Sequence, residues 1–200
     1  MNRESHRNLT TKAAYVLLRN DYADWEPASA LAELRRSFGY SVQTMGLTTE
    51  PIVSMGGLRV IPHIALSDFV AESAAILILP GGDAWREGEV VGVSEAVNAM
   101  IAIGQPVAAI CAATLALAHA GLLDDREHTS NGREFIGKYV HKYRGQGMYR
   151  ASRAVSDHLV ITANGLAPFA FAAEIFRTLA PERKLDIETY ESLYASGLFD

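Results

Sequence analysis

Hydrophobic residues along the chain fall into short apolar runs that alternate with longer segments of helical periodicity. Each short run is followed by a turn or by small residues, as is typical of buried strands. The runs predicted as strands are 13–18, 40–45, 75–79, 107–110 and 159–162, with Val155 as further strand material. The segments predicted as helices lie between Asp24 and Gly39 and over 90–103, 112–120, 167–179 and 185–196.

The order of these elements indicates an α/β fold. Alternating strands and helices call for a mainly parallel sheet with helices on both faces. The segment 51–62 differs, because two short apolar runs flank Gly56-Gly57 and predict a small β-hairpin. Residues 124–153 are the least regular part, predicted to form loops over one edge of the sheet. We therefore expect a flexible tail over 1–11 and a single domain over 12–200.

Composition and charge exclude several functional classes. Hydrophobic residues make up 49% of the chain and charged residues 20%, which is ordinary for a globular protein. The net charge of -5 and the absence of a basic run argue against binding nucleic acid or a membrane surface. No run reaches the roughly 18 consecutive apolar residues of a membrane helix. A single cysteine and a polar N-terminal segment favour a reducing compartment, and we expect a cytoplasmic protein.

Cys111 has the sequence context of a nucleophile elbow. It directly follows the predicted strand 107–110 and opens a predicted helix, and small residues such as Ala112 allow a sharp turn. The N-terminus of that helix should lower the pKa of the thiol and favour the thiolate. Backbone N–H groups of Ala112 and Gly82 could stabilise an oxyanion. The alternative is that Cys111 is a small buried hydrophobic residue without chemistry.

Glu26 lies in the first predicted helical turn after the first strand, and thus at the same edge of the sheet as Cys111. Its carboxylate could hydrogen-bond the sulfur and move a proton. The alternative is a charge that only complements the helix N-terminus. The neighbouring Asp24 is predicted as the N-cap, and Trp25 could line an apolar pocket, although packing is the more usual role of tryptophan.

A histidine that could activate the cysteine is not obvious. A cysteine nucleophile is usually paired with a histidine base. His119 lies two helical turns after Cys111, roughly 12 Å along the axis, which is too far for direct contact. His128 lies in the next loop and could reach back, or it could be an ordinary surface histidine.

Several segments together resemble the ThiJ/PfpI family, within the class I glutamine amidotransferase-like superfamily. The resemblance spans roughly residues 13–180. The segments that carry it are Asp24-Trp25-Glu26, Ile78-Leu79-Pro80-Gly81-Gly82, Ala109-Ile110-Cys111-Ala112-Ala113, Ala118-His119-Ala120-Gly121-Leu122-Leu123, Thr129-Ser130-Asn131, Leu159-Val160-Ile161-Thr162-Ala163-Asn164-Gly165 and Phe171-Ala172.

The resemblance implies a flavodoxin-like three-layer sandwich that forms a homodimer. It also implies a reactive cysteine, a carboxylate partner and two backbone oxyanion donors, which here are Cys111, Glu26, Gly82 and Ala112. The third member of the site would be His128 or Asn131, since Asn131 falls where other members have a histidine. We expect Asp24, Trp25, Gly81 and Thr114 to line the pocket, and neither a metal nor a cofactor to be needed.

The chain also departs from well-known branches of the family. Peptidase-type members have a histidine directly after the cysteine, where this chain has Ala112, and isonitrile hydratases have a threonine there. Ala180 stands where glutaminases have their histidine, which argues against glutamine amidotransferase activity.

These observations leave two hypotheses for the function. In one, the Cys111 thiolate attacks a small amide or aldehyde, as in an amidase or a glyoxalase-like lyase. In the other, the cysteine is a non-catalytic redox sensor or part of a metabolite-binding pocket.

Overall fold

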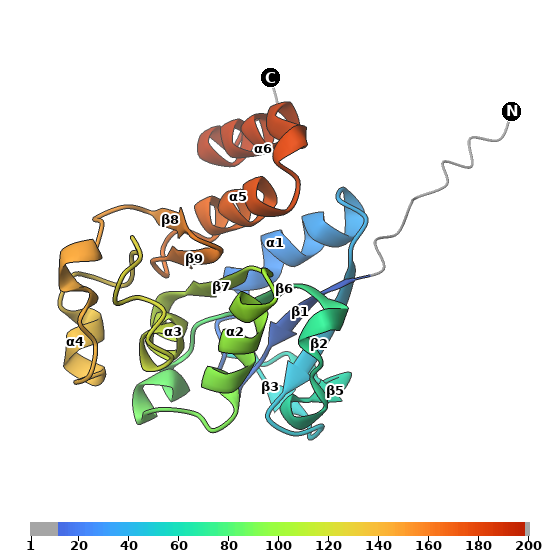
Figure 1. Ribbon diagram of the computed structural model, residues 1–200. Helices are drawn as coiled ribbons and strands as arrows, with labels where there is room; N and C mark the ends of the chain where they lie inside the picture. The colour runs from blue at the N-terminus through green and yellow to red at the C-terminus, as the bar shows by residue number, and fades with distance from the viewer. Residues whose placement is uncertain (1–11, 199–200) are drawn as a thin grey trace, which may run out of the picture.

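The central feature of the computed structural model, which describes residues 12–198, is one seven-stranded sheet (Figure 1). Its strand order is β5-β2-β1-β6-β7-β9-β8, and every pairing is parallel except that of β8 with β9. The strands are β1 (Ala13–Leu17), β2 (Ser41–Gly46), β5 (Ile64–Ala65), β6 (Ala74–Leu79), β7 (Val107–Ile110), β8 (Ala154–Asp157) and β9 (Val160–Ala163). The predicted tail over 1–11 lies outside the described residues.

Helices cover both faces of this sheet, which confirms the three-layer α/β prediction. One face carries α1 (Trp25–Arg36) and α5 (Pro168–Leu179), with α6 (Lys184–Ser196) packed on α5. The other face carries α2 (Val93–Ala102) and α3 (Thr114–His119), with α4 (Phe135–Tyr139) beside α3. Short 3₁₀ helices connect these elements at Leu66–Asp68, Ala71–Ser73, Asp83–Glu87, Cys111–Ala113, Gly145–Met148 and Pro181–Arg183.

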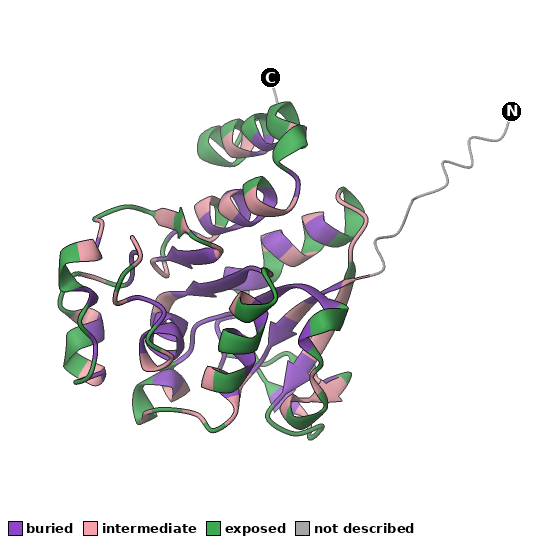
Figure 2. Ribbon diagram, in the orientation of Figure 1, coloured by how far each residue is buried: buried purple, intermediate pink, exposed green. Residues whose placement is uncertain are grey.

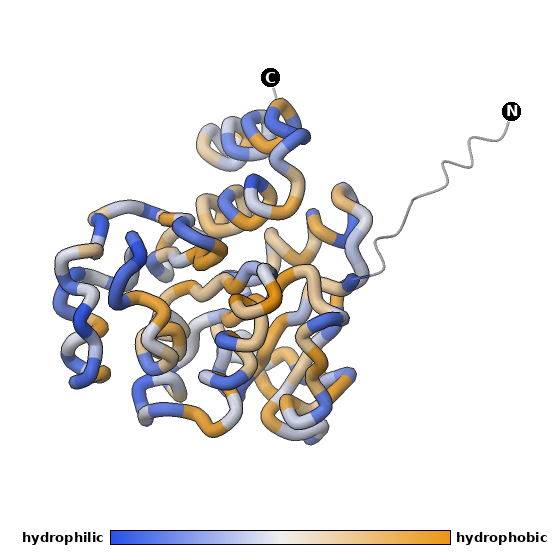
Figure 3. The backbone as a smooth tube through the Cα atoms, viewed as in Figure 1, coloured by the Kyte–Doolittle hydropathy of each residue, from blue (hydrophilic) through white to orange (hydrophobic). Residues whose placement is uncertain are grey.

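The alternation of side chains along β6 shows why the sheet is buried on both sides. Ile76 and Ile78 pack in the cluster beneath α1 and α5, whereas Leu77 and Leu79 pack in the cluster beneath α2 and α3. All four are fully buried, as successive residues of a strand point to opposite faces. Figure 2 shows that the neighbouring central strands are buried as well, and Figure 3 places hydrophilic residues in the loops around α4.

The predicted hairpin is confirmed as a separate two-stranded antiparallel sheet of β3 (Ile52–Val53) and β4 (Arg59–Val60). Gly57 in its turn has a φ of +82°, a conformation that glycine adopts without strain. The predicted loops over 124–153 contain the short helix α4. The edge strand β5 was not predicted, because a strand of two residues shows no periodicity. No helix within residues 12–198 has the length and apolar character needed to cross a bilayer.

The topology brings four strand ends to one edge of the sheet. The parallel strands β1, β6, β7 and β9 are neighbours, so the segments that follow them begin side by side. Ligand sites of open α/β sheets lie beyond the carboxyl ends of such strands.

Candidate active site

Cys111 occupies a strained elbow directly after β7. Its φ is +61°, in the left-handed region that residues other than glycine rarely adopt, which costs on the order of 1–3 kcal/mol. The backbone then enters the 3₁₀ turn Cys111–Ala113 and continues as α3. Ala112 and Ala113 are both buried, so the sharp turn requires small side chains here. Strain of this kind is characteristic of functional positions.

Gly81 and Gly165 leave room for the sulfur of Cys111 because they have no side chain. A Cβ atom on Gly81, after β6, would lie 2.6 Å from Cβ of Cys111 and 2.7 Å from Oε2 of Glu26. A Cβ atom on Gly165, after β9, would lie 2.8 Å from Sγ of Cys111 and 3.1 Å from Oε1 of Glu26. Neither glycine has a left-handed φ, so close approach explains these residues.

Glu26 is held against the sulfur from the first turn of α1. Its side chain is buried, with only 1% of the residue exposed, and Oε2 accepts a hydrogen bond of 2.6 Å from the backbone N–H of Gly81. A backbone bond of 3.0 Å from Ala23 N–H to the Gly81 carbonyl ties the two loops together. Burial raises the pKa of Glu26, while hydrogen bonds from Gly81 and from the Cys111 thiol act in the opposite direction.

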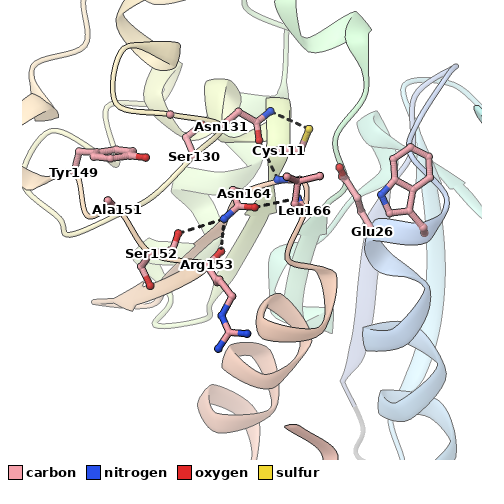
Figure 4. A pocket seen from close by; sticks show the side chains of 13 residues that line it. Glu26, Cys111, Ser130, Asn131, Tyr149, Ala151, Ser152, Arg153, Asn164 and Leu166 are labelled. Atoms are coloured by element: carbon pink, nitrogen blue, oxygen red, sulfur yellow. Dashed lines mark hydrogen bonds between the residues drawn. The ribbon is translucent and has the colours of Figure 1, made fainter. Parts of the chain in front are cut away.

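Asn131 provides a second polar contact to the sulfur (Figure 4). Its Nδ2 donates to Sγ of Cys111 over 3.1 Å, and its Oδ1 accepts the backbone N–H of Gly165 over 2.9 Å. The second bond determines which end of the amide faces the sulfur. Of the two predicted third members, the structure thus brings Asn131 to Cys111.

The pKa of the Cys111 thiol is shifted in the direction opposite to that expected from the sequence. Burial and the nearby Glu26 carboxylate raise the pKa to about 11, although hydrogen bonds from Asn131 and the Ala112 N–H lower it. The expected lowering by a helix N-terminus was wrong because loss of solvation and a neighbouring negative charge outweigh the peptide dipoles. With this pKa the sulfur is a thiol at neutral pH, and it shares a hydrogen bond with Glu26.

The sulfur and the carboxylate border a cavity of about 700 Å³. Trp25 lies at this cavity with 53% of its surface exposed. The lining residues come from α1, the elbow and three loops: Trp25, Glu26, Cys111, Ser130, Asn131, Gly132, Tyr149, Ala151, Ser152, Arg153, Asn164, Gly165 and Leu166. A cavity of this size suits a small molecule.

His128 lies away from the sulfur. Its ring is fully buried, with Nδ1 2.8 Å from the Arg126 carbonyl and Nε2 2.6 Å from the Tyr143 hydroxyl. Nδ1 must carry the proton that the carbonyl accepts, so Nε2 accepts from Tyr143. Burial lowers the pKa of His128. The structure thus gives it a packing role, and neither the catalytic nor the surface-loop interpretation describes it.

Three predicted pocket residues support the site from behind instead of lining the cavity. Asp24 begins α1 without a side-chain capping bond, and its carboxylate binds the hairpin through Ser54 Oγ at 2.8 Å and Gly56 N–H at 3.0 Å. Thr114 is fully buried, and its Oγ1 donates to the Cys111 carbonyl over 2.8 Å. Gly81 is buried between Cys111 and Glu26.

None of the predicted site residues comes from two lining segments, 149–153 and 164–166, although the first belongs to the loops predicted over 124–153. The second could have been found, because Asn164 and Gly165 follow the parallel strand β9 at the edge where the other site loops meet. The first precedes the antiparallel strand β8, and no motif marks it. Within residues 12–198, no group of three or more His, Cys, Asp or Glu side chains is arranged to hold a metal ion.

Comparison with known proteins gives a consistent result. The sequence model of the DJ-1/PfpI family matches residues 12–178. The Bacillus subtilis protein named uncharacterized protease YoaZ is 35% identical, covering 86% of this chain and 85% of its own. The Caenorhabditis elegans glutathione-independent glyoxalase DJR-1.2 is 28% identical, covering 86% and 91%.

Solved structures agree in fold. The DJ-1 superfamily protein Atu0886 from Agrobacterium tumefaciens superimposes with a TM-score of 0.82 at 34% identity, covering 92% of this chain and 99% of its own. A thiJ/pfpI family protein from Bacillus anthracis gives a TM-score of 0.78 at 38% identity, covering 86% and 84%.

Proposed function

Because this chain belongs to the DJ-1/PfpI family, we propose that it is a cysteine-dependent enzyme that acts on a small carbonyl compound, an aldehyde or an amide. The observation that carries the proposal is the position of the Cys111 sulfur. It lies on a strained elbow at a cavity of about 700 Å³, in contact with one proton acceptor, Glu26, and one neutral donor, Asn131. A purely structural cysteine requires none of these features.

The reaction begins with coupled proton transfer and attack. As Sγ of Cys111 forms a bond to the carbonyl carbon, its proton passes to the Glu26 carboxylate and the C=O π electrons move to oxygen. The backbone N–H groups of Gly82 and Ala112 hold the resulting oxyanion. Coupling is needed because the thiol, with a pKa of about 11, is not ionised beforehand.

The next proton transfer decides between the two substrate classes. With a 2-oxoaldehyde, Glu26 returns the proton to the oxyanion and a neutral hemithioacetal forms. Glu26 then moves the proton from the carbon bonded to sulfur to the adjacent carbonyl carbon, which gives the thioester of a 2-hydroxy acid, and attack of water on this thioester releases the acid and restores the Cys111 thiol. With an amide, Glu26 must protonate the leaving nitrogen, the amine departs, and water must then attack the thioester. In the described residues no histidine contacts Sγ, so Glu26 alone carries protons. The aldehyde route requires no protonation of a leaving nitrogen, and we propose it as the primary activity.

The relatives support testing both classes. The Caenorhabditis elegans relative is named a glyoxalase, and the Bacillus subtilis relative YoaZ is named an uncharacterized protease. We therefore propose the amide route as the second candidate reaction of the same site.

The alternative function is a redox sensor. In that case hydrogen peroxide would oxidise Cys111 to a sulfenic acid and be reduced to water. The lack of a histidine at the sulfur among residues 12–198 favours this alternative over a hydrolase. The raised pKa argues against it, because the thiolate is the form that reacts with peroxide.

The test is turnover by the wild-type protein and by Cys111→Ala and Cys111→Ser. We expect consumption of methylglyoxal by the wild type and its loss in both variants, with simple amides assayed in parallel. Circular dichroism and thermal unfolding confirm that the variants fold. Turnover that persists in Cys111→Ala would contradict the proposal. A wild type without turnover that forms sulfenic acid readily would establish the sensor instead.

A further inference from the structure

A second cavity adjoins the candidate active site. It has a volume of about 420 Å³ and lies between the start of α5 and the second half of α6. Arg153 and Leu166 line both cavities, so the two spaces meet at these side chains. We call this second cavity the α5–α6 groove. A ligand whose carbonyl lies at Cys111 could extend past Leu166 into it.

The groove contains a cationic group without a partner. Arg153 is exposed, and Figure 4 shows its side chain running from the cavity wall away from Cys111 and alongside the helix that follows Leu166. Within residues 12–198 its guanidinium makes no hydrogen bond or ion pair. The acidic side chain of the groove, Glu191, is paired with Arg177, so it does not neutralise Arg153. This arrangement favours a negatively charged ligand group.

The rest of the groove offers an aromatic and apolar surface. The rings of Phe169 and Tyr194 stack with centroids 4.3 Å apart at an interplanar angle of 21°. They remain 42% and 44% exposed, and Leu166 at the junction is 96% exposed. Large side chains exposed together beside a charged group are typical of a binding surface.

We infer that the α5–α6 groove is a second subsite, which binds the distal end of the substrate as an aromatic or apolar arm that ends in a carboxylate. Phe169 and Leu166 contact the arm, and Arg153 pairs with the carboxylate. The inference rests on the proposed function, in which the reacting carbonyl lies at Cys111. It adds that the preferred substrate is longer than methylglyoxal, the three-carbon test aldehyde, and carries an acidic group at its far end.

The experiment measures how fast Cys111 is alkylated by two matched probes, so it requires no turnover. The probes are 4-(2-chloroacetamido)benzoate and its neutral carboxamide, which differ in charge alone. We expect the benzoate to react about threefold to fivefold faster with the wild type, as a partly exposed ion pair allows. In Arg153→Gln this ratio should fall to about one, with the carboxamide rate unchanged, and Arg153→Lys should keep most of it.

Two controls separate the subsite from other effects. Arg36→Gln, on the last turn of α1, removes the same charge elsewhere and should leave the ratio unchanged. Titration of Cys111→Ala with 4-acetamidobenzoate measures reversible binding where the thiol plays no part, and Arg153→Gln should weaken it in that background. Equal rates for the two probes with the wild type, or an undiminished ratio in Arg153→Gln, would overturn the subsite. A wild type that shows the expected probe ratio but turns over neither methylglyoxal nor a carbonyl compound with such an acidic arm would instead reject the proposed function.

Discussion

The side-chain amide of Asn131 faces the sulfur of Cys111 at 3.1 Å, oriented by the backbone N–H of Gly165, which donates to its Oδ1 over 2.9 Å. An amide can donate a hydrogen bond to a developing thiolate, but it cannot take up the thiol proton. Proton transfer at the sulfur therefore depends on Glu26, the titratable group that shares a hydrogen bond with it. Asn131 is thus the neutral hydrogen-bond donor and Glu26 the proton carrier, so variants at these two positions should behave differently.

Replacing Asn131 by alanine should slow alkylation of Cys111. The lost hydrogen bond stabilises the thiolate by roughly 1 kcal/mol, so the iodoacetamide rate at pH 7 should fall about fivefold. Asn98→Ala, on the exposed side of α2, is the matched control and should keep the wild-type rate. An unchanged rate in Asn131→Ala would mean that the bond to the sulfur has no influence on its ionisation.

Glu26→Gln should affect alkylation and turnover in opposite directions. The carboxylate contributes to the raised pKa of the thiol, so its removal should lower that pKa and increase the iodoacetamide rate at pH 7. Turnover of methylglyoxal should nevertheless fall by about 100-fold or more, because the proton carrier is lost. Glu33→Gln, two turns further along α1, controls for the change in charge. Parallel losses in both assays would indicate a disrupted site instead.

The raised pKa of Cys111 predicts a loss of stability at alkaline pH. In the unfolded chain the thiol ionises near pH 9, whereas in the native state it ionises near pH 11. Between these values the unfolded state binds fewer protons, so the free energy of unfolding decreases as the pH rises.

Urea unfolding from pH 8 to pH 11 measures this effect as the difference between the wild type and Cys111→Ser, in which the tyrosine contributions cancel. The wild type should lose about 1–2 kcal/mol more than the variant over this range, a value reduced for the partial exposure of the sulfur. Parallel curves for the two proteins would show that the thiol is not perturbed.

Gly165→Ala should abolish activity with little change in fold. The added Cβ would lie 2.8 Å from the sulfur and 3.1 Å from Glu26, so the two groups must separate. A displacement of about 1 Å at a reacting group can reduce the rate about 100-fold. Gly137→Ala is the matched control, because its Cβ would meet no atom within 4 Å, and it should retain full turnover. Full activity in Gly165→Ala would show that the sulfur tolerates displacement.

The sequence by itself determined the layer architecture and the position of the nucleophile. The fully apolar segment 75–79 can be satisfied only with helices on both faces, and Cys111 after a strand and before small residues predicts an elbow. Glu26 was found in the same way, from its place at the start of a helix that follows a parallel strand. These features depend on local periodicity and on chain order, which a sequence contains.

Only the tertiary structure decided which groups reach the sulfur and what charge it carries. His128 and Asn131 are three residues apart, yet the path of their loop turns the histidine toward Tyr143 and the amide toward Cys111. The sign of the thiol pKa shift depends on how much water the surrounding layers exclude and on a carboxylate 85 positions away in the sequence. Contacts between distant segments and the desolvation they cause are properties of the packed molecule, and no local pattern encodes them.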